Sequence, residues 1–148
     1  MRLFLLYCVC SSVSPTCPLE RLILRNADVD DFECERFVEA IKENKSLVEL
    51  DLSNNKIGSA ENLNTVMPDL VTGGEALAEL LRLPQCNLRT LKVDWNMIRL
   101  DGAIDFADSL RTNATLTYLD LSFNSLSTEG GITLGVSILS NTTLETLI

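Results

Sequence analysis

Few residues of this 148-residue chain are of the types that catalyse reactions or bind metals. Histidine is absent, which excludes Ser-His-Asp and Cys-His catalysis and any metal site that needs an imidazole ligand. The five cysteines form no C-x-x-C motif, so neither a zinc site nor a thioredoxin-like site is expected. They are Cys8, Cys10, Cys17, Cys34 and Cys86. The sequence therefore predicts no catalytic residue, no metal and no cofactor.

Acidic residues are the remaining candidates for chemistry. Two acid pairs stand close in sequence, Asp30 with Asp31 and Glu33 with Glu35. Nothing in the sequence places either pair in a cleft, and carboxylates on a solvated loop are ordinarily surface charge. The chain carries 21 acidic and 12 basic residues, a net charge of -9, which disfavours binding to nucleic-acid phosphates or anionic lipid. We therefore expect a protein partner, with no nucleic acid and no membrane insertion.

A repeated template, Leu-x-x-Leu-x-Leu-x-x-Asn, is the strongest pattern in the sequence. Its copies start at Leu19, Leu47, Leu88, Leu116 and Leu144, so the spacings are 28, 41, 28 and 28 residues. Between the copies, apolar pairs four residues apart lie ten and six residues before the next start, which places both members on one helical face. These pairs are Phe37/Ile41, Phe106/Leu110 and Leu134/Ile138. Each unit is therefore predicted to be a short strand, a turn and a returning helix.

Asparagines mark the predicted helix ends. Asn44, Asn113 and Asn141 each lie three residues before a repeat start and suit that position. The same residues form N-x-[ST] sequons, but because the repeat itself demands Asn there, we assign them to structure rather than to glycosylation. Glycine pairs at 73–74 and 130–131 fit neither the dinucleotide nor the P-loop pattern and are predicted to be helix-entry residues.

The template and its period resemble the leucine-rich repeat family over residues 19–148. A 28-residue repeat with a full helix is similar to the ribonuclease-inhibitor subclass, which also includes the sensor regions of NOD-like receptors and the Ran GTPase-activating protein. The resemblance implies an α/β fold. It would be a right-handed solenoid shaped as a horseshoe arc, with a parallel sheet on the concave face and helices on the convex face. Stacking also explains the repetition, because one unit cannot bury its apolar face alone.

The turn after each strand is predicted to carry a ladder of asparagine side chains. Asn55, Asn96 and Asn124 occupy the last template position, where their amides can bind backbone groups of neighbouring turns. Ala27 stands where the family pattern has Asn or Cys. The first repeat should therefore lack one rung.

The chain is predicted to divide into residues 1–18 and the repeats, 19–148. The second repeat carries 13 extra residues, most of them near 57–74. This insertion is either a functional loop or the result of neutral drift. The helix after it should contain Leu77 and Leu81. The last strand ends at Ile148, and an open edge strand invites pairing. We expect either a fragment of a larger scaffold or receptor, or a partner that completes the repeat.

Residues 1–18 fit two interpretations. A basic start and the apolar run over 3–10 resemble a short secretory signal peptide. Alternatively, Val9 and Val13 fall at the helical core positions of the repeat and belong to a degenerate capping helix. The odd number of cysteines argues against a disulfide framework and favours a reducing compartment. We expect a cytoplasmic protein, or a secreted or cell-surface protein if residues 1–14 are a signal peptide.

Candidate binding residues are predicted on the concave sheet face. Because strand side chains alternate, the second, fourth and sixth residues after each repeat start should face solvent. Together with the position that follows, they give this partner-binding set: Arg21, Arg25, Glu49, Asp51, Lys92, Asp94, Trp95, Tyr118, Asp120 and Phe123. Charge on this face changes from basic in the first strand to mostly acidic in the later ones.

Three aromatic residues stand out in this set. Trp95 and Phe123 occupy the same position of adjacent repeats and should lie about one strand spacing, roughly 4.8 Å, apart, with Tyr118 close by. Trp and Tyr are enriched among interface hot spots. The alternative is that Trp95 and Phe123 pack only on each other or on the next turn, and phenylalanine in a Ser-Phe-Asn stretch is common in leucine-rich repeats.

These features favour a non-enzymatic module that binds a protein partner through the concave sheet face. The alternatives are the sensor region of a NOD-like innate immune receptor and a Ran-type GTPase-activating protein. A shared fold does not decide among these functions, and no pattern in the sequence identifies the partner.

Overall fold

The structure is a computed structural model, and it describes residues 17–61, 67 and 69–148. Within these residues, strands and helices alternate along the chain. Their bounds are β1 Arg21–Ile23, α2 Asp31–Ile41, β2 Glu49–Asp51, α3 Gly73–Arg82, β3 Thr90–Lys92, α4 Leu100–Ser109, β4 Tyr118–Asp120, α5 Ser127–Ser140 and β5 Thr146–Leu147. The predicted cap or signal segment, up to residue 16, and part of the insertion lie outside the described residues.

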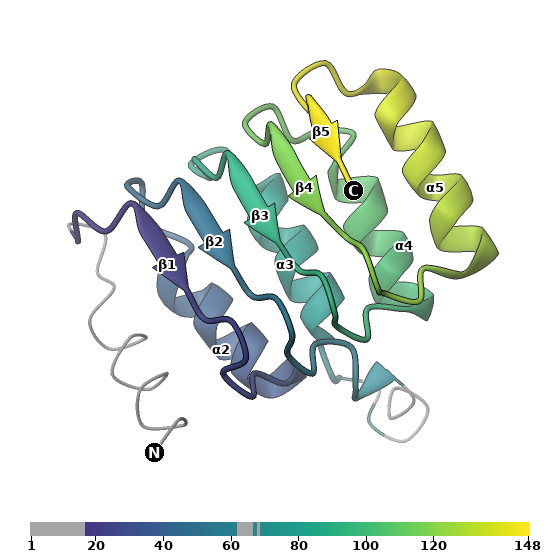
Figure 1. Ribbon diagram of the computed structural model, residues 1–148, viewed down its shortest axis with the longest axis horizontal. Helices are drawn as coiled ribbons and strands as arrows, with labels where there is room; N and C mark the ends of the chain where they lie inside the picture. The colour runs from purple at the N-terminus through teal and green to yellow at the C-terminus, as the bar shows by residue number, and fades with distance from the viewer. Residues whose placement is uncertain (1–16, 62–66, 68) are drawn as a thin grey trace.

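The strands form one parallel sheet in the order β1-β2-β3-β4-β5, and the helices all lie on one side of it (Figure 1). Register follows the repeat, because the same template leucine lies at the centre of each pairing. Leu22 pairs with Leu50, Leu50 with Leu91, Leu91 with Leu119, and Leu119 with Leu147. Strand pairing therefore follows the template position, whether the repeat starts are 28 or 41 residues apart.

The core lies between the sheet and the helices. The template leucines of the second, third and fourth repeats are buried there, and so are the helical residues Phe37 and Phe106. Burying each such side chain contributes about 1.5–3 kcal/mol. The prediction for Ile138 was wrong, since 37% of it is exposed. No described element packs against the far side of α5, so that side chain lacks the neighbours that cover its counterparts.

The predicted asparagine ladder is confirmed. Asn96 Nδ2 donates to the Val93 carbonyl (3.0 Å), and its Oδ1 accepts from the Ile57 backbone N–H (3.0 Å) of the preceding repeat. Asn55 makes the equivalent bond to the first repeat, where its Oδ1 accepts from the Val29 N–H (3.0 Å), and it also accepts from the Ala27 N–H (3.0 Å). Ala27 has no side-chain amide that could continue the series, so the ladder ends there as predicted.

The asparagines of the sequons bind the backbone where each helix returns to its strand. Asn113 Oδ1 accepts from the Leu116 N–H (2.8 Å), and its Nδ2 donates to the Leu81 carbonyl (2.9 Å) of the preceding helix. Asn44 and Asn141 make the equivalent bonds in their own repeats. Asn44 and Asn113 are buried. These contacts account for the asparagines without glycosylation.

Glycines near the helix starts allow adjacent helices to approach closely. A Cβ added to Gly74 of α3 would lie 2.7 Å from the Gly102 carbonyl oxygen of α4. One added to Gly130 of α5 would lie 3.3 Å from the Ala103 Cβ. Gly74 and Gly130 are therefore packing residues near the starts of their helices, where the sequence predicted helix-entry glycines.

Candidate functional site

The outer face of the sheet, away from the helices, carries most of the predicted binding residues at its surface. Arg21, Arg25, Trp95 and Phe123 are exposed, and Glu49, Lys92, Tyr118 and Asp120 are half-buried. On this face the predicted basic edge is already paired, because Arg21 Nε lies 2.7 Å from Glu49 Oε2. An ion pair this exposed contributes little stability.

The prediction that Asp51 and Asp94 face solvent was wrong. Asp51 and Asp94 are buried, with exposed fractions of 6% and 9%. Asp51 Oδ1 accepts from the Ser53 backbone N–H (2.9 Å), and the Ser53 hydroxyl donates to Asp94 Oδ1. These bonds hold both carboxylates along the sheet, where buried polar groups need partners. Asp51 and Asp94 therefore stabilise the strand ends and are not available to a partner.

Trp95 and Phe123 form a stacked aromatic pair. Their ring centroids are 4.1 Å apart and the ring planes differ by 14°. The predicted spacing of one strand is confirmed, and so is the packing of the two rings on each other. Both rings nevertheless remain open to solvent, with exposed fractions of 54% for Trp95 and 65% for Phe123. The pair is therefore a preformed apolar surface rather than part of the core.

The backbone at both aromatic residues is left-handed. Trp95 has φ 54° and Phe123 has φ 55°, and the same position in the first two repeats is held by Asn26 (φ 54°) and Asn54 (φ 55°). Asparagine visits this region readily, whereas a bulky side chain costs roughly 1–2 kcal/mol there. Two repeats thus place a poorly suited aromatic residue at a turn where asparagine fits better.

Tyr118 and Lys92 extend this surface along the strands. Lys92 Nζ lies 6.0 Å from the centroid of the Tyr118 ring, within the range of a cation–π contact. Lys92 of β3 is also the register partner of Asp120 on β4. Tyr118 begins β4, Phe123 follows the end of β4, and Trp95 follows the end of β3. That Tyr118 lies close to the aromatic pair remains a prediction from these strand positions.

The acid pairs that the sequence singled out lie at the N-terminus of α2. Asp30 is the N-cap of α2, and its Oδ1 accepts from the Glu33 backbone N–H (3.1 Å). A side-chain hydrogen bond with Asp30 also raises the pKa of Glu33. Within the described part of the chain, no group of three potential ligands among His, Cys, Asp and Glu could hold a metal ion.

Comparisons with known proteins agree with this architecture. A family model described as a leucine-rich repeat matches residues 43–60 and 112–135. Ribonuclease inhibitor of Mus musculus is 36% identical over 123 residues, which cover 83% of this chain and 24% of that protein. The NACHT, LRR and PYD domains-containing protein 12 of Mus musculus is 33% identical over 116 residues, 78% of this chain and 10% of that protein. This chain belongs to the leucine-rich repeat family.

The ribonuclease-inhibitor-like class and the right-handed α/β solenoid are both confirmed. A solved structure of leiomodin-1 actin-binding site 2 superposes with a TM-score of 0.71 at 20% identity, covering 96% of this chain and 75% of that one, which shows the fold alone. This leucine-rich repeat chain spans about a quarter of the length of ribonuclease inhibitor and about a tenth of the NACHT protein. The matched families indicate repeat modules for binding and no catalytic family.

None of the helices in the described part of this repeat protein combines the length and the apolar character that crossing a membrane requires.

Asp31 is a structural residue whose role the sequence did not reveal. It is fully buried at the start of α2. Its Oδ1 accepts from the backbone N–H groups of Gly58 and Gly73, each at 2.7 Å, and its Oδ2 accepts from that of Ala60, also at 2.7 Å. One carboxylate thus fixes both ends of the insertion to the repeat before it. Only the fold brings these partners, 27 to 42 residues later in the chain, to its side.

Glu61 anchors the insertion to the repeat after it. Its Oε1 accepts from the Gly102 backbone N–H (2.8 Å) of α4, while its buried Oε2 has no partner among the described residues. Burial raises the pKa of Glu61. The described part of the insertion is therefore held by buried carboxylates on both sides.

The two later cysteines are free thiols inside the core. Cys34 and Cys86 are buried, and burial raises the pKa of both thiols. Cys34 Sγ donates to the Gly73 carbonyl oxygen at 3.7 Å. A thiol in such a site is a small packing residue and not a nucleophile.

Proposed function

We propose that this chain is a protein-binding repeat module whose partner contacts the outer sheet face at the aromatic pair, Trp95 and Phe123. The main observation that supports this proposal is that two stacked rings at a left-handed turn remain more than half exposed. Backbone strain combined with exposure is ordinarily retained where the side chain does something for function. Rings already held by each other also lose little freedom when a partner covers them.

The surroundings of the pair supply polar contacts for the same partner. Lys92, Tyr118 and Asp120 lie on the two strands that lead to the pair, and they are half-buried. Arg21 and Glu49 offer a paired charge at the other end of the sheet. An apolar centre with a polar rim is the usual arrangement of a protein interface. We propose this set, without Asp51 and Asp94, as the partner-binding site.

The relatives suggest which partner to test first. The name of one relative says that it inhibits ribonuclease, so a purified ribonuclease is the first probe. Cys34 and Cys86 are buried without a disulfide partner, which supports a reducing compartment such as the cytoplasm.

A second candidate function is the sensor region of a NOD-like receptor. Two NACHT, LRR and PYD domains-containing proteins, one from Mus musculus and one from Homo sapiens, are 33% and 34% identical to this chain over 116 residues. Sequencing the transcript that encodes the chain separates the two functions. A NACHT segment encoded in the same transcript would support the receptor, and its absence from every transcript would leave the stand-alone module.

The site itself is tested by Trp95→Asn and Phe123→Asn. Asparagine is the residue that the first two repeats carry at this turn, so the change removes the ring and relieves the backbone. Binding to ribonuclease, and to purified proteins first captured on the immobilised chain, is measured by calorimetry. We expect at least one partner to bind each variant about tenfold or more weakly. The matched control is Phe32→Ala, which removes an exposed aromatic ring from the helical side. Equal affinity of the wild-type chain and both asparagine variants for every partner would overturn the proposal.

A further inference from the structure

A second surface suited to binding lies on the opposite, helical side of the molecule. A groove of about 600 Å³ runs between α4 and α5. One wall is apolar and the other is acidic. The apolar wall is Ile104 of α4 with Ile132 and Val136 of α5, and the acidic wall is Asp101, Asp105 and Asp108 of α4.

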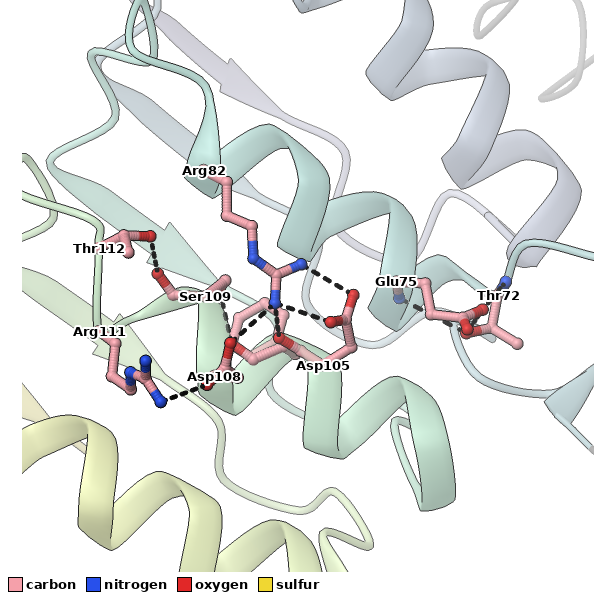
Figure 2. Close-up of polar contacts among 9 residues, drawn as sticks. Thr72, Glu75, Arg82, Asp105, Asp108, Ser109, Arg111 and Thr112 are labelled. Carbon is pink, nitrogen blue, oxygen red and sulfur yellow. Dashed lines mark hydrogen bonds and ion pairs between the residues drawn. The ribbon is translucent and has the colours of Figure 1, made fainter.

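The acidic wall is only partly neutralised. Figure 2 shows Arg82 reaching from α3 to Asp105 and Asp108 of α4, at 2.7 and 3.2 Å, with Arg111 beside them at 3.3 Å from Asp108. Asp101 is exposed and forms no ion pair with any described residue. The groove thus keeps an unpaired carboxylate at its edge.

The negative charge continues onto α3. A neighbouring hollow shares Glu75 and Asp105 with the groove and adds Asp69 and Glu79. Six carboxylates and the guanidinium groups of Arg82 and Arg111 line the two hollows. This excess of negative charge disfavours an anionic lipid surface, and it disfavours a second copy of this chain, whose net charge is -9. It favours a cationic ligand.

The apolar wall is unusually open for a helix of this composition. Ile132 is 63% exposed and Val136 is 52% exposed, and Leu139 of the same helix is 89% exposed. Such a helix is ordinarily covered on more than one side. Beside them Ser137 lines the groove, is fully buried, and has a hydroxyl without a hydrogen-bond partner among the described residues.

We propose that this groove binds a cationic amphipathic helical segment of a partner protein. Lysine or arginine side chains of the segment face Asp101 and the hollow beyond it, and its aliphatic face covers Ile132 and Val136. This is the helix-in-groove mode of recognition, in which apolar anchors supply affinity and the charged rim fixes orientation. The groove is separate from the aromatic pair, so both surfaces can be occupied at once.

The test uses a synthetic helical peptide with leucine on one face and lysine on the other, titrated into the isotope-labelled full chain and followed by amide NMR. We expect shifts confined to α4, α5 and the adjoining start of α3. Two matched peptides, with glutamate for lysine or serine for leucine, should cause no shift. Shifts on the sheet face, or equal binding of the serine peptide, would overturn the proposal.

Variants of each wall complete the test. Asp101→Asn and Val136→Ser should each weaken binding of the leucine-lysine peptide about tenfold, because one removes the unpaired charge and the other the apolar cover. Glu43→Gln, an exposed acid on another part of the surface, and Trp95→Asn should leave the affinity unchanged. An equal loss with Glu43→Gln would show attraction to net charge alone. If analytical ultracentrifugation without peptide showed that the chain dimerises through this groove, the occupant would be a second copy of the chain. Either result contradicts the proposal.

Discussion

The carboxylate of Asp31 accepts a hydrogen bond of 2.7 Å from the backbone N–H of Gly73, and so joins the first turn of α2 to the first turn of α3 across the insertion. The same side chain accepts from two further backbone N–H groups. In Asp31→Asn, an NH2 group replaces one carboxylate oxygen. An NH2 group cannot accept a hydrogen bond from the backbone N–H groups that face it. We expect the free energy of unfolding to fall by about 2–3 kcal/mol, measured by urea denaturation.

The matched control is the neighbouring acid. Asp30 is an N-cap, and asparagine is as good as aspartate at that position. Asp30→Asn should therefore change the free energy of unfolding by only a few tenths of a kcal/mol. Comparable losses in the two variants would contradict the role assigned to Asp31.

Glu61 should make stability depend on pH. Its pKa in the folded chain is raised above the ordinary value of 4.5, so the folded state holds its proton more tightly than the unfolded state does. The contribution of Glu61 is therefore most favourable at acidic pH and is lost as pH rises from 4.5 through its folded pKa. Glu61→Gln should remove this loss and be at least as stable as the wild-type chain at neutral pH. Thermal unfolding between pH 4 and 8 measures it. A variant whose stability follows the wild-type pH curve in parallel would refute the assignment, and exposed Glu43→Gln is the control.

The repeat architecture could be predicted because it is a property of spacing. Leu50, Leu91 and Leu119 share one template position, and a parallel sheet built of equal units has to align them. The asparagine ladder followed for the same reason, down to the missing rung at Ala27. Periodicity determines which residues stack, and stacking determines the fold.

The candidate site could be predicted only in part. The alternation of side chains along a strand predicts which face a side chain is on, but not whether neighbouring residues bury it. Asp94 holds a template position predicted to face solvent, yet it is buried and accepts a hydrogen bond from the Ser53 hydroxyl of the preceding repeat. The left-handed backbone at Trp95 and the three backbone hydrogen bonds to Asp31 depend on contacts between distant residues. No local pattern in the sequence reports them.

The buried thiols should resist modification. Burial is the first reason that the pKa of Cys34 is raised, with Asp31 the next, so very little thiolate is present near neutral pH. In the native chain N-ethylmaleimide should label Cys17, which is half-exposed, and should label Cys34 and Cys86 only after urea unfolding. Peptide mapping by mass spectrometry locates the label. Labelling of Cys34 as fast as Cys17 in the native chain would show that this part of the core is open.

Two glycines of similar helical position should respond in opposite directions to alanine. Gly74→Ala places a Cβ 2.7 Å from the Gly102 carbonyl oxygen, so the helices must move apart, at a cost of about 1–3 kcal/mol. Gly131 of α5 has nothing within 4 Å, so Gly131→Ala should stabilise the chain by about 0.5–1 kcal/mol through helix propensity. Denaturation midpoints of the two variants check both signs. Equal effects would mean that helix packing does not limit this position.

Trp95 is the only tryptophan of the chain, which makes the aromatic pair directly observable. The most direct test is the fluorine NMR signal of the chain labelled with fluorotryptophan, recorded with and without a partner identified by calorimetry. Coverage of the pair predicts a changed shift and loss of the difference between spectra in H2O and D2O, because water no longer reaches the ring. A complex that forms while the signal keeps its position and its solvent dependence would contradict binding at this surface.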